Sequence, residues 1–197
     1  MKRLLPVLLA CALILSLGAC DKAGGKRESF QNTDVTGLGY AKGFSLTDQN
    51  GKQRTLADFK GKVVIVFFGY TQCPDVCPTT MAELSAVMQK LGPQANDVQV
   101  LFITLDPERD TQQLLAEYVP AFDKRFLGLR GTPEQTAATA KEFKLFYAKV
   151  PGADPKSYTI DHMAGSYVFD REGRVRVFIR SGQGTDTIVH DLKQLLS

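Results

Sequence analysis

Two cysteines, Cys73 and Cys77, stand four residues apart where an apolar run gives way to a helical pattern. Val63 to Phe68 is typical of a buried strand, Gly69 to Gln72 of a turn, and a helix is expected from Pro78. At a helix start, residues four apart lie on one face, with Cα atoms roughly 6 Å apart, which a disulfide allows. Unpaired amides and the helix dipole there favour thiolate over thiol. The pair can therefore hold a soft metal ion or cycle between dithiol and disulfide.

A permanent structural disulfide is the third use for this pair. A bridge between Cys73 and Cys77 closes a loop too short to restrict the unfolded chain much, so it would add little stability. We therefore favour metal binding or thiol exchange.

The first twenty residues have the composition of an export signal. Lys2 and Arg3 precede an apolar segment, 4–17, that is shorter than the about 20 residues needed to span a bilayer. Small residues then precede Cys20, an ending that resembles the cleavage box of bacterial lipoproteins. The resemblance implies that residues 1–19 are removed and that Cys20 carries lipid. Ordinary signal cleavage and an uncleaved anchor are the alternatives.

The number of cysteines then leaves one pair for the folded domain. Cys11 would leave with the signal and Cys20 would carry lipid, so Cys73 and Cys77 remain. An exported compartment is oxidising, so this pair will form a disulfide unless a metal or a reductant keeps it open.

The composition predicts one globular domain behind a short tether. The polar stretch after Cys20 is typical of a flexible linker, and we expect the tether at residues 20–39 and the domain at residues 40–197. Without Lys2 and Arg3, 22 basic side chains stand against 21 acidic ones, a net charge of +1. No basic tract with interleaved aromatic residues occurs, so nucleic acid is not an expected partner.

Alternating helical and strand patterns predict an α/β fold with a mixed central sheet flanked by helices. An N-terminal β-hairpin extension is expected around the turn Asp48 to Gly51. After the cysteines and their helix, the expected elements are strand 98–105, helix 111–122, strand 126–129, helix 133–143, strand 145–150, segment 158–162 leading into strand 166–169, strand 174–179 and helix 185–196.

A central strand that delivers a dithiol to a helix start resembles the thioredoxin arrangement, with two departures. Three residues rather than two separate the cysteines, and the segment 161–166, where a thioredoxin has its cis-proline, contains no proline. His162 stands in that segment, so a thioredoxin-like fold would bring its imidazole against the two thiols. The other histidine, His190, fits the surface of the last helix.

Several motifs together resemble the Sco/SenC family of copper chaperones for cytochrome oxidase. The resemblance is carried by Cys73-Pro74-Asp75-Val76-Cys77-Pro78, by residues 104–111 and 126–132, and by Tyr158-Thr159-Ile160-Asp161-His162. It implies a thioredoxin-like fold and copper held by Cys73, Cys77 and His162.

Coordination chemistry agrees with this resemblance. Thiolates favour Cu(I), imidazole suits copper in either oxidation state, and three side chains are too few for structural zinc. The family resemblance further implies delivery to the copper centre of cytochrome c oxidase subunit II. A periplasmic copper donor and a thiol reductant would be further partners.

Neighbouring polar residues have a functional and a structural interpretation. Asp161 could orient the imidazole or cap a turn, and Asp75 could tune the thiolates or, as we favour, start the helix. The loop 106–110 could face a partner, whereas Asp110 and Thr111 suit turn and helix-cap chemistry without one.

We therefore expect a copper-binding domain tethered by lipid at the periplasmic face of the cell membrane. The main alternative is a thiol–disulfide oxidoreductase that reduces the cysteines of the oxidase before copper arrives. A third is a peroxidase, because Thr71-Gln72-Cys73 loosely resembles thiol peroxidases. The sequence leaves chaperone and reductase open, although the missing proline weighs against a general oxidoreductase.

Overall fold

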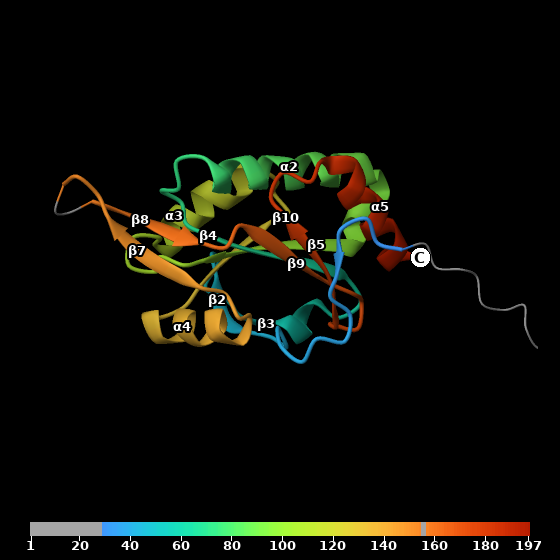
Figure 1. Cartoon of the computed structure of the whole chain (residues 1–197), viewed down its shortest axis with the longest axis horizontal. Coiled ribbons are helices and arrows are strands. Elements are labelled where there is room, and N and C mark those ends of the chain that lie inside the picture. Colours follow the sequence, from blue (N-terminus) through green and yellow to red (C-terminus); the bar gives the residue numbers. More distant parts are fainter. Residues whose placement is uncertain (1–28, 155–156) are drawn as a thin grey trace, which may run out of the picture.

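A mixed eight-stranded sheet, in the order β1-β10-β9-β4-β5-β6-β2-β3, forms the centre of the molecule. The structure is a computed structural model that describes residues 29–154 and 157–197, so the predicted signal and Cys20 lie outside the described residues. Helices α2 (Val76–Leu91), α3 (Gln112–Tyr118) and α5 (Thr185–Leu196) lie on one face of the sheet, and α4 (Pro133–Glu142) lies on the other (Figure 1). This is the thioredoxin-like arrangement expected from the sequence.

The central strand β4 (Val63–Gly69) is buried along its whole length. It pairs in parallel with β5 (Val98–Thr104) and antiparallel with β9 (Gly165–Phe169). Helices cover both faces of this part of the sheet, so the strand needs a continuous apolar run rather than an alternating one. The core therefore holds the strand that leads to the cysteines.

The predicted hairpin is present as β2 (Ser45–Asp48) and β3 (Gln53–Thr55). Asp48 accepts backbone hydrogen bonds from Asn50 and Lys52, which stabilises the turn. Strand β2 also pairs with β6 (Leu127–Arg130), so the hairpin is the edge of the main sheet rather than an appendage.

The chain joins the fold before residue 40, earlier than the predicted end of the tether. Strand β1 (Thr33–Asp34) pairs with β10 (Val175–Arg180) at the other edge of the sheet. The Asp191 carboxylate of α5 accepts the backbone N–H groups of Gln31 and Asn32. The last part of the predicted tether is therefore bound to the domain.

Two helices differ from the expected boundaries for local reasons. Helix α2 begins at Val76, two residues before Pro78, with Asp75 as its N-cap residue as favoured above. The helix expected over 111–122 is α3 followed by a 3-10 turn, η3 (Val119–Ala121), because Pro120 lacks the N–H that would continue an α-helix. The other 3-10 segments are η1 (Leu56–Phe59) and η2 (Gly92–Asp97).

Within residues 29–154 and 157–197, no helix is both long and apolar enough to cross a bilayer.

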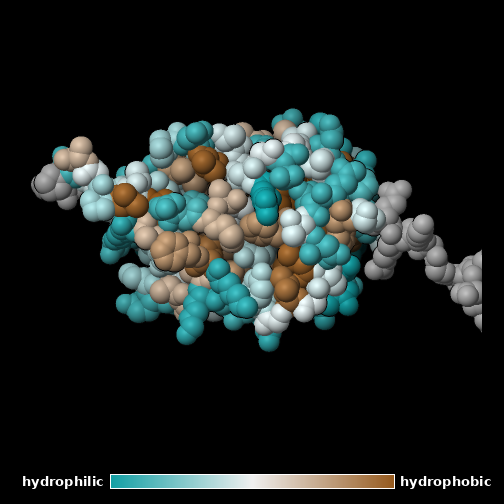
Figure 2. All heavy atoms as spheres, viewed as in Figure 1, coloured by the Kyte–Doolittle hydropathy of each residue, from teal (hydrophilic) through white to brown (hydrophobic). Residues whose placement is uncertain are grey.

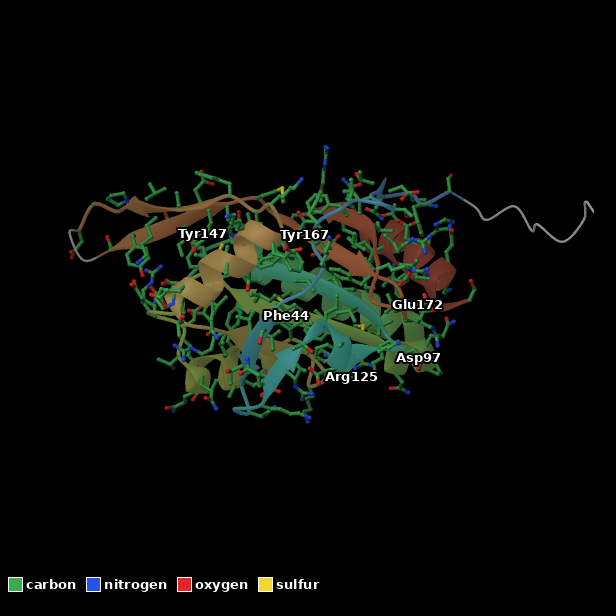
Figure 3. The ribbon with its side chains drawn as sticks, turned by 90° about the horizontal axis from the view of Figure 1, so that it is seen from below. Phe44, Asp97, Arg125, Tyr147, Tyr167 and Glu172 are labelled. Carbon is green, nitrogen blue, oxygen red and sulfur yellow. The ribbon has the colours of Figure 1, made fainter. Side chains whose placement is uncertain are left out.

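Strands β7 (Tyr147–Pro151) and β8 (Tyr158–His162) form a separate two-stranded ribbon that projects from one end of the molecule (Figure 1). Tyr147, labelled in Figure 3, pairs with His162 at the base of this ribbon. The alternate residues Tyr158, Ile160 and His162 are at least partly buried, whereas the residues between them are exposed. One face of the ribbon therefore turns toward the domain.

Candidate metal centre

The two cysteines lie at the connection between the end of β4 and the first turn of α2, as the sequence predicts. Both thiols are free; Cys73 is half-buried and Cys77 has no exposed surface. The backbone N–H of Cys77 donates a hydrogen bond of 3.4 Å to the Cys73 sulfur. The first turn of α2 therefore directs an amide dipole at Cys73, as a helix N-terminus does toward an anion.

The pKa values of the two thiols are shifted in opposite directions from the ordinary thiol value. Burial raises the pKa of Cys73, but the backbone N–H groups of Asp75, Cys77 and Val76 outweigh it, and the net pKa lies below the ordinary thiol value. Burial also raises the pKa of Cys77, and here the hydrogen-bonded Cys73 sulfur adds to the effect. Cys73 is therefore the more acidic of the two thiols, and Cys77 is the less acidic and more buried one.

Gly69, the last residue of β4, allows Cys77 to approach the sheet closely. A Cβ atom at this position would lie 2.9 Å from the Cys77 sulfur and 2.9 Å from the Phe102 ring. A Cβ atom makes no hydrogen bonds, and its ordinary van der Waals contacts are longer than this. The missing side chain of Gly69 therefore sets the depth of the buried sulfur.

His162 reaches the cysteines from the ribbon. Its Nε2 atom lies 3.8 Å from the Cys77 sulfur, and its Nδ1 atom lies 3.1 Å from the backbone carbonyl of Met163. A carbonyl can only accept, so Nδ1 carries the hydrogen and the Nε2 lone pair of the neutral ring faces the sulfur. Burial lowers the pKa of His162, which favours this neutral form. The buried Tyr70 ring stands edge-on to the imidazole, with 6.3 Å between ring centroids.

The structure therefore brings Cys77 and His162 together beside Cys73, but it does not place Asp161 against the ring. Asp161 is exposed, and its charge acts on the pKa of His162 only through space. The group that orients the imidazole is the Met163 carbonyl. Among the described residues, no three His, Cys, Asp or Glu side chains are arranged to hold a metal ion jointly.

Of Asp110 and Thr111, expected to serve turn and helix-cap chemistry, only Thr111 caps a helix. Thr111 caps α3 by accepting the Leu114 N–H, whereas Asp110 is fully buried and accepts both the N–H and the hydroxyl of Thr71. The Thr104 hydroxyl also donates to Asp110, at 2.5 Å. Burial raises the pKa of Asp110 in spite of these donors. Asp110 therefore fixes the turn that carries Cys73.

Several apolar side chains next to the cysteines, next to the histidine and along the ribbon are exposed. Val76, between the cysteines, and Met163, after the histidine, are each 39% exposed. Phe146 and Val150, at the ribbon, are also exposed. Figure 2 shows apolar patches among hydrophilic side chains at the ribbon end of the molecule. Exposed apolar side chains of this kind are typical of surfaces that bind other proteins.

Sequence reasoning missed Tyr70, the Met163 carbonyl and the contacts of the loop 106–110. Tyr70 follows the buried strand and precedes the cysteines, so its position alone was a usable signal. A backbone carbonyl carries no signal in a sequence. His190 contacts Asp191 in the last helix, far from the cysteines in sequence and on a different element.

Comparison with known proteins gives one consistent result. The family model described as SCO1/SenC matches residues 35–197. The chain is 36% identical over 153 residues to the mitochondrial SCO2 homolog of Mus musculus, covering 77% of this chain and 60% of the mouse protein. It therefore spans less than two thirds of the length of that relative.

Solved structures agree with the family match. ScoI of Bradyrhizobium japonicum, solved with copper bound, has a TM-score of 0.72 and 41% identity, covering 78% of this chain and 97% of that one. Apo Sco1 of Thermus thermophilus has a TM-score of 0.76 and 38% identity, covering 87% of this chain and 99% of that one.

Proposed function

Since the chain belongs to the SCO1/SenC family, we propose that it binds one copper ion through Cys73, Cys77 and His162 and delivers it to a cytochrome c oxidase. The observation that carries the proposal is the 3.8 Å approach of the His162 Nε2 lone pair to the Cys77 sulfur, beside the Cys73 thiol. The copper-bound relative from Bradyrhizobium japonicum supports copper as the ion.

The donor set fits copper as cargo. Two thiolates are soft ligands that favour Cu(I), and a neutral imidazole can bind either oxidation state. The thiols must lose their protons, and Cys73 is already disposed to do so, whereas burial opposes ionisation of Cys77 until a cation arrives. A disulfide between Cys73 and Cys77 would remove both thiolates, so loading depends on reduction.

Transfer would proceed by ligand exchange at the open side of the site. Cu(I) is stable with two or three soft ligands, so an incoming thiolate can replace His162 or Cys73 without releasing the ion. The exposed Val76 and Met163 would contact the partner at that moment. The partner proposed is the copper centre of oxidase subunit II, reached from the periplasmic side.

The proposal includes a lipid tether at Cys20. The sequence before Cys20 supports it, and the first described residues support a favourable orientation. Residues 31–34 are bound to α5 and β10, at the end of the molecule opposite the ribbon (Figure 1). A tether leaving from that end would leave the site facing away from the membrane.

Thiol–disulfide exchange is the second candidate, and the different acidities of the two thiols favour it. The Cys73 thiolate would attack a target disulfide, forming a mixed disulfide and releasing one target thiolate. Cys77, after losing its proton, would then attack the Cys73 sulfur and release the second target thiol. The target gains two electrons and the pair becomes a disulfide, which a thiol reductant must restore.

Anaerobic copper analysis beside insulin-reduction and peroxide assays separates these functions. Stoichiometric copper with slow disulfide reduction supports the chaperone. Catalytic reduction without copper supports the oxidoreductase, and peroxide turnover would support neither.

A further inference from the structure

We propose that Asp106, Arg109 and Tyr158 form a latch that docks the β7–β8 ribbon on the domain and thereby positions His162. The inference rests on the proposed function, because it assigns the residues that hold the histidine ligand in place. Figure 1 shows why a latch is needed, since the ribbon projects from the end of the main sheet.

The latch holds Tyr158 at three points. The buried Asp106 carboxylate accepts a hydrogen bond of 2.8 Å from the Tyr158 hydroxyl and another from Arg109 Nε. Arg109 Nη1 donates to the Tyr158 carbonyl at 2.9 Å, and the guanidinium lies 3.5 Å from the Tyr158 ring centroid. Charge-assisted hydrogen bonds and a desolvated cation–π contact are among the stronger side-chain interactions.

The ribbon depends on contacts of this kind. Strands β7 and β8 hydrogen-bond to each other and to no strand of the main sheet in the described structure. A two-stranded ribbon is only marginally stable by itself in water. Tyr158 and His162 belong to the same inward face of β8, one at each end. Docking Tyr158 therefore determines how closely His162 approaches the cysteines.

One loop holds both halves of the site. Asp106 and Arg109 bind the ribbon, while Asp110 in the same loop binds Thr71 of the cysteine turn. The Arg109 guanidinium also lies 5.8 Å from the centroid of the Tyr70 ring, which contacts His162. The loop 104–110 is thus the common support for ligands that are 85 residues apart in the sequence.

One atom of the latch lacks a hydrogen-bond partner. The Arg109 Nη2 atom is buried without a partner among the described residues. A buried polar atom without a partner costs free energy, so it offsets part of the stabilisation that the other contacts of Arg109 provide. An undocked ribbon would withdraw His162 and leave copper on the two thiolates, ready for exchange.

A second contact between the same segments provides a matched control. Glu108 and Lys149 form an ion pair between the loop and β7, but their side chains are 57% and 49% exposed. Exposed ion pairs contribute little because water screens them. Glu108→Gln therefore removes a link between the loop and the ribbon while Asp106, Arg109 and Tyr158 stay unchanged. Lys149 Nζ, 4.6 Å from the Tyr158 ring centroid, also stays in place.

Hydrogen–deuterium exchange of the reduced, metal-free protein tests the latch directly. Tyr158→Phe removes one charge-assisted hydrogen bond and keeps the ring, so amides of residues 147–154 and 157–162 should exchange roughly tenfold faster. Amides of β4 and β5 should keep their rates, and Glu108→Gln should match the wild type. Unchanged ribbon exchange in Tyr158→Phe, or an equal acceleration throughout the domain, would overturn the proposal.

Copper release tests whether the latch acts through His162. Arg109→Gln should speed Cu(I) transfer to a chelator roughly tenfold in the wild-type background and have no effect in His162→Ala. Equal acceleration in both backgrounds would overturn the positioning role. Wild-type protein that binds no copper would refute the proposed function. The hydrogen–deuterium exchange experiment uses metal-free protein, so it would still test the latch.

Discussion

Replacing Gly69 by alanine tests whether the depth of Cys77 governs the site. The new Cβ would meet the Cys77 sulfur and the Phe102 ring, both at 2.9 Å, and the Phe67 ring at 3.2 Å. Heavy atoms prefer separations of about 3.5–4.0 Å, so each of the nearest neighbours must retreat by about 0.6 Å or more. Cys77 and both rings have no exposed surface, so none can yield toward solvent.

The expected cost is that of overpacking a core, about 1–3 kcal/mol. For a domain of this size each kcal/mol lowers Tm by about 2–4 °C, so calorimetry of the metal-free protein should register a fall of roughly 2–12 °C. The displaced sulfur should also weaken the thiolate-to-Cu(II) absorption band. Gly39→Ala is the matched control, because a Cβ there meets nothing within 4 Å. A Gly69→Ala protein with the Tm and the absorption of Gly39→Ala would refute the reasoning.

Three further predictions concern the site chemistry. Because backbone N–H groups outweigh burial at Cys73, Cys77→Ser protein should be alkylated by iodoacetamide with a midpoint below the ordinary thiol pKa of 9.0. Cys73→Ser protein should react slowly and only at higher pH, and identical profiles would contradict the assignment. His162→Ala should keep the thiol reactivity and lose Cu(II) affinity by at least about 100-fold, since groups behind a ligand already contribute 10–100-fold; unchanged Cu(II) uptake would remove His162 from the site. Burial raises the folded-state pKa of Asp110, so wild-type stability should fall as pH rises through that pKa. Asp110→Asn has no carboxyl group to ionise at this position. Its free energy of unfolding in urea, relative to that of the wild type, should therefore increase from pH 4 to pH 7. A difference that stays constant over this range would contradict the pKa shift.

Local patterns in the sequence were sufficient for the cysteine half of the site. The continuous apolar run of β4 and the helix after it need only neighbouring residues to be recognised. Both elements are present, although the helix begins two residues before Pro78. Strand β1 was missed because two residues are too few to form a pattern. Pro120 was a visible signal for the end of α3, but the prediction of one continuous helix over residues 111–122 did not use it.

The histidine half depended on the fold. Nothing local links His162 to cysteines 85 residues earlier, and only the thioredoxin-like resemblance brought them together. The supporting contacts were beyond reach for the same reason, since Asp110 meets Thr71 across 39 residues and Arg109 meets Tyr158 across 49. An aspartate can serve in a local turn or support a distant segment, and its residue type does not say which. For Asp110, burial distinguished the two roles.

X-ray absorption at the copper edge tests the central claim most directly. The reduced protein loaded with one equivalent of Cu(I) should show sulfur neighbours from Cys73 and Cys77 together with the outer-ring scattering of one imidazole. That imidazole signal should vanish in His162→Ala while the sulfur signal remains. An imidazole signal that persists in His162→Ala, or a copper environment without sulfur, would contradict the account.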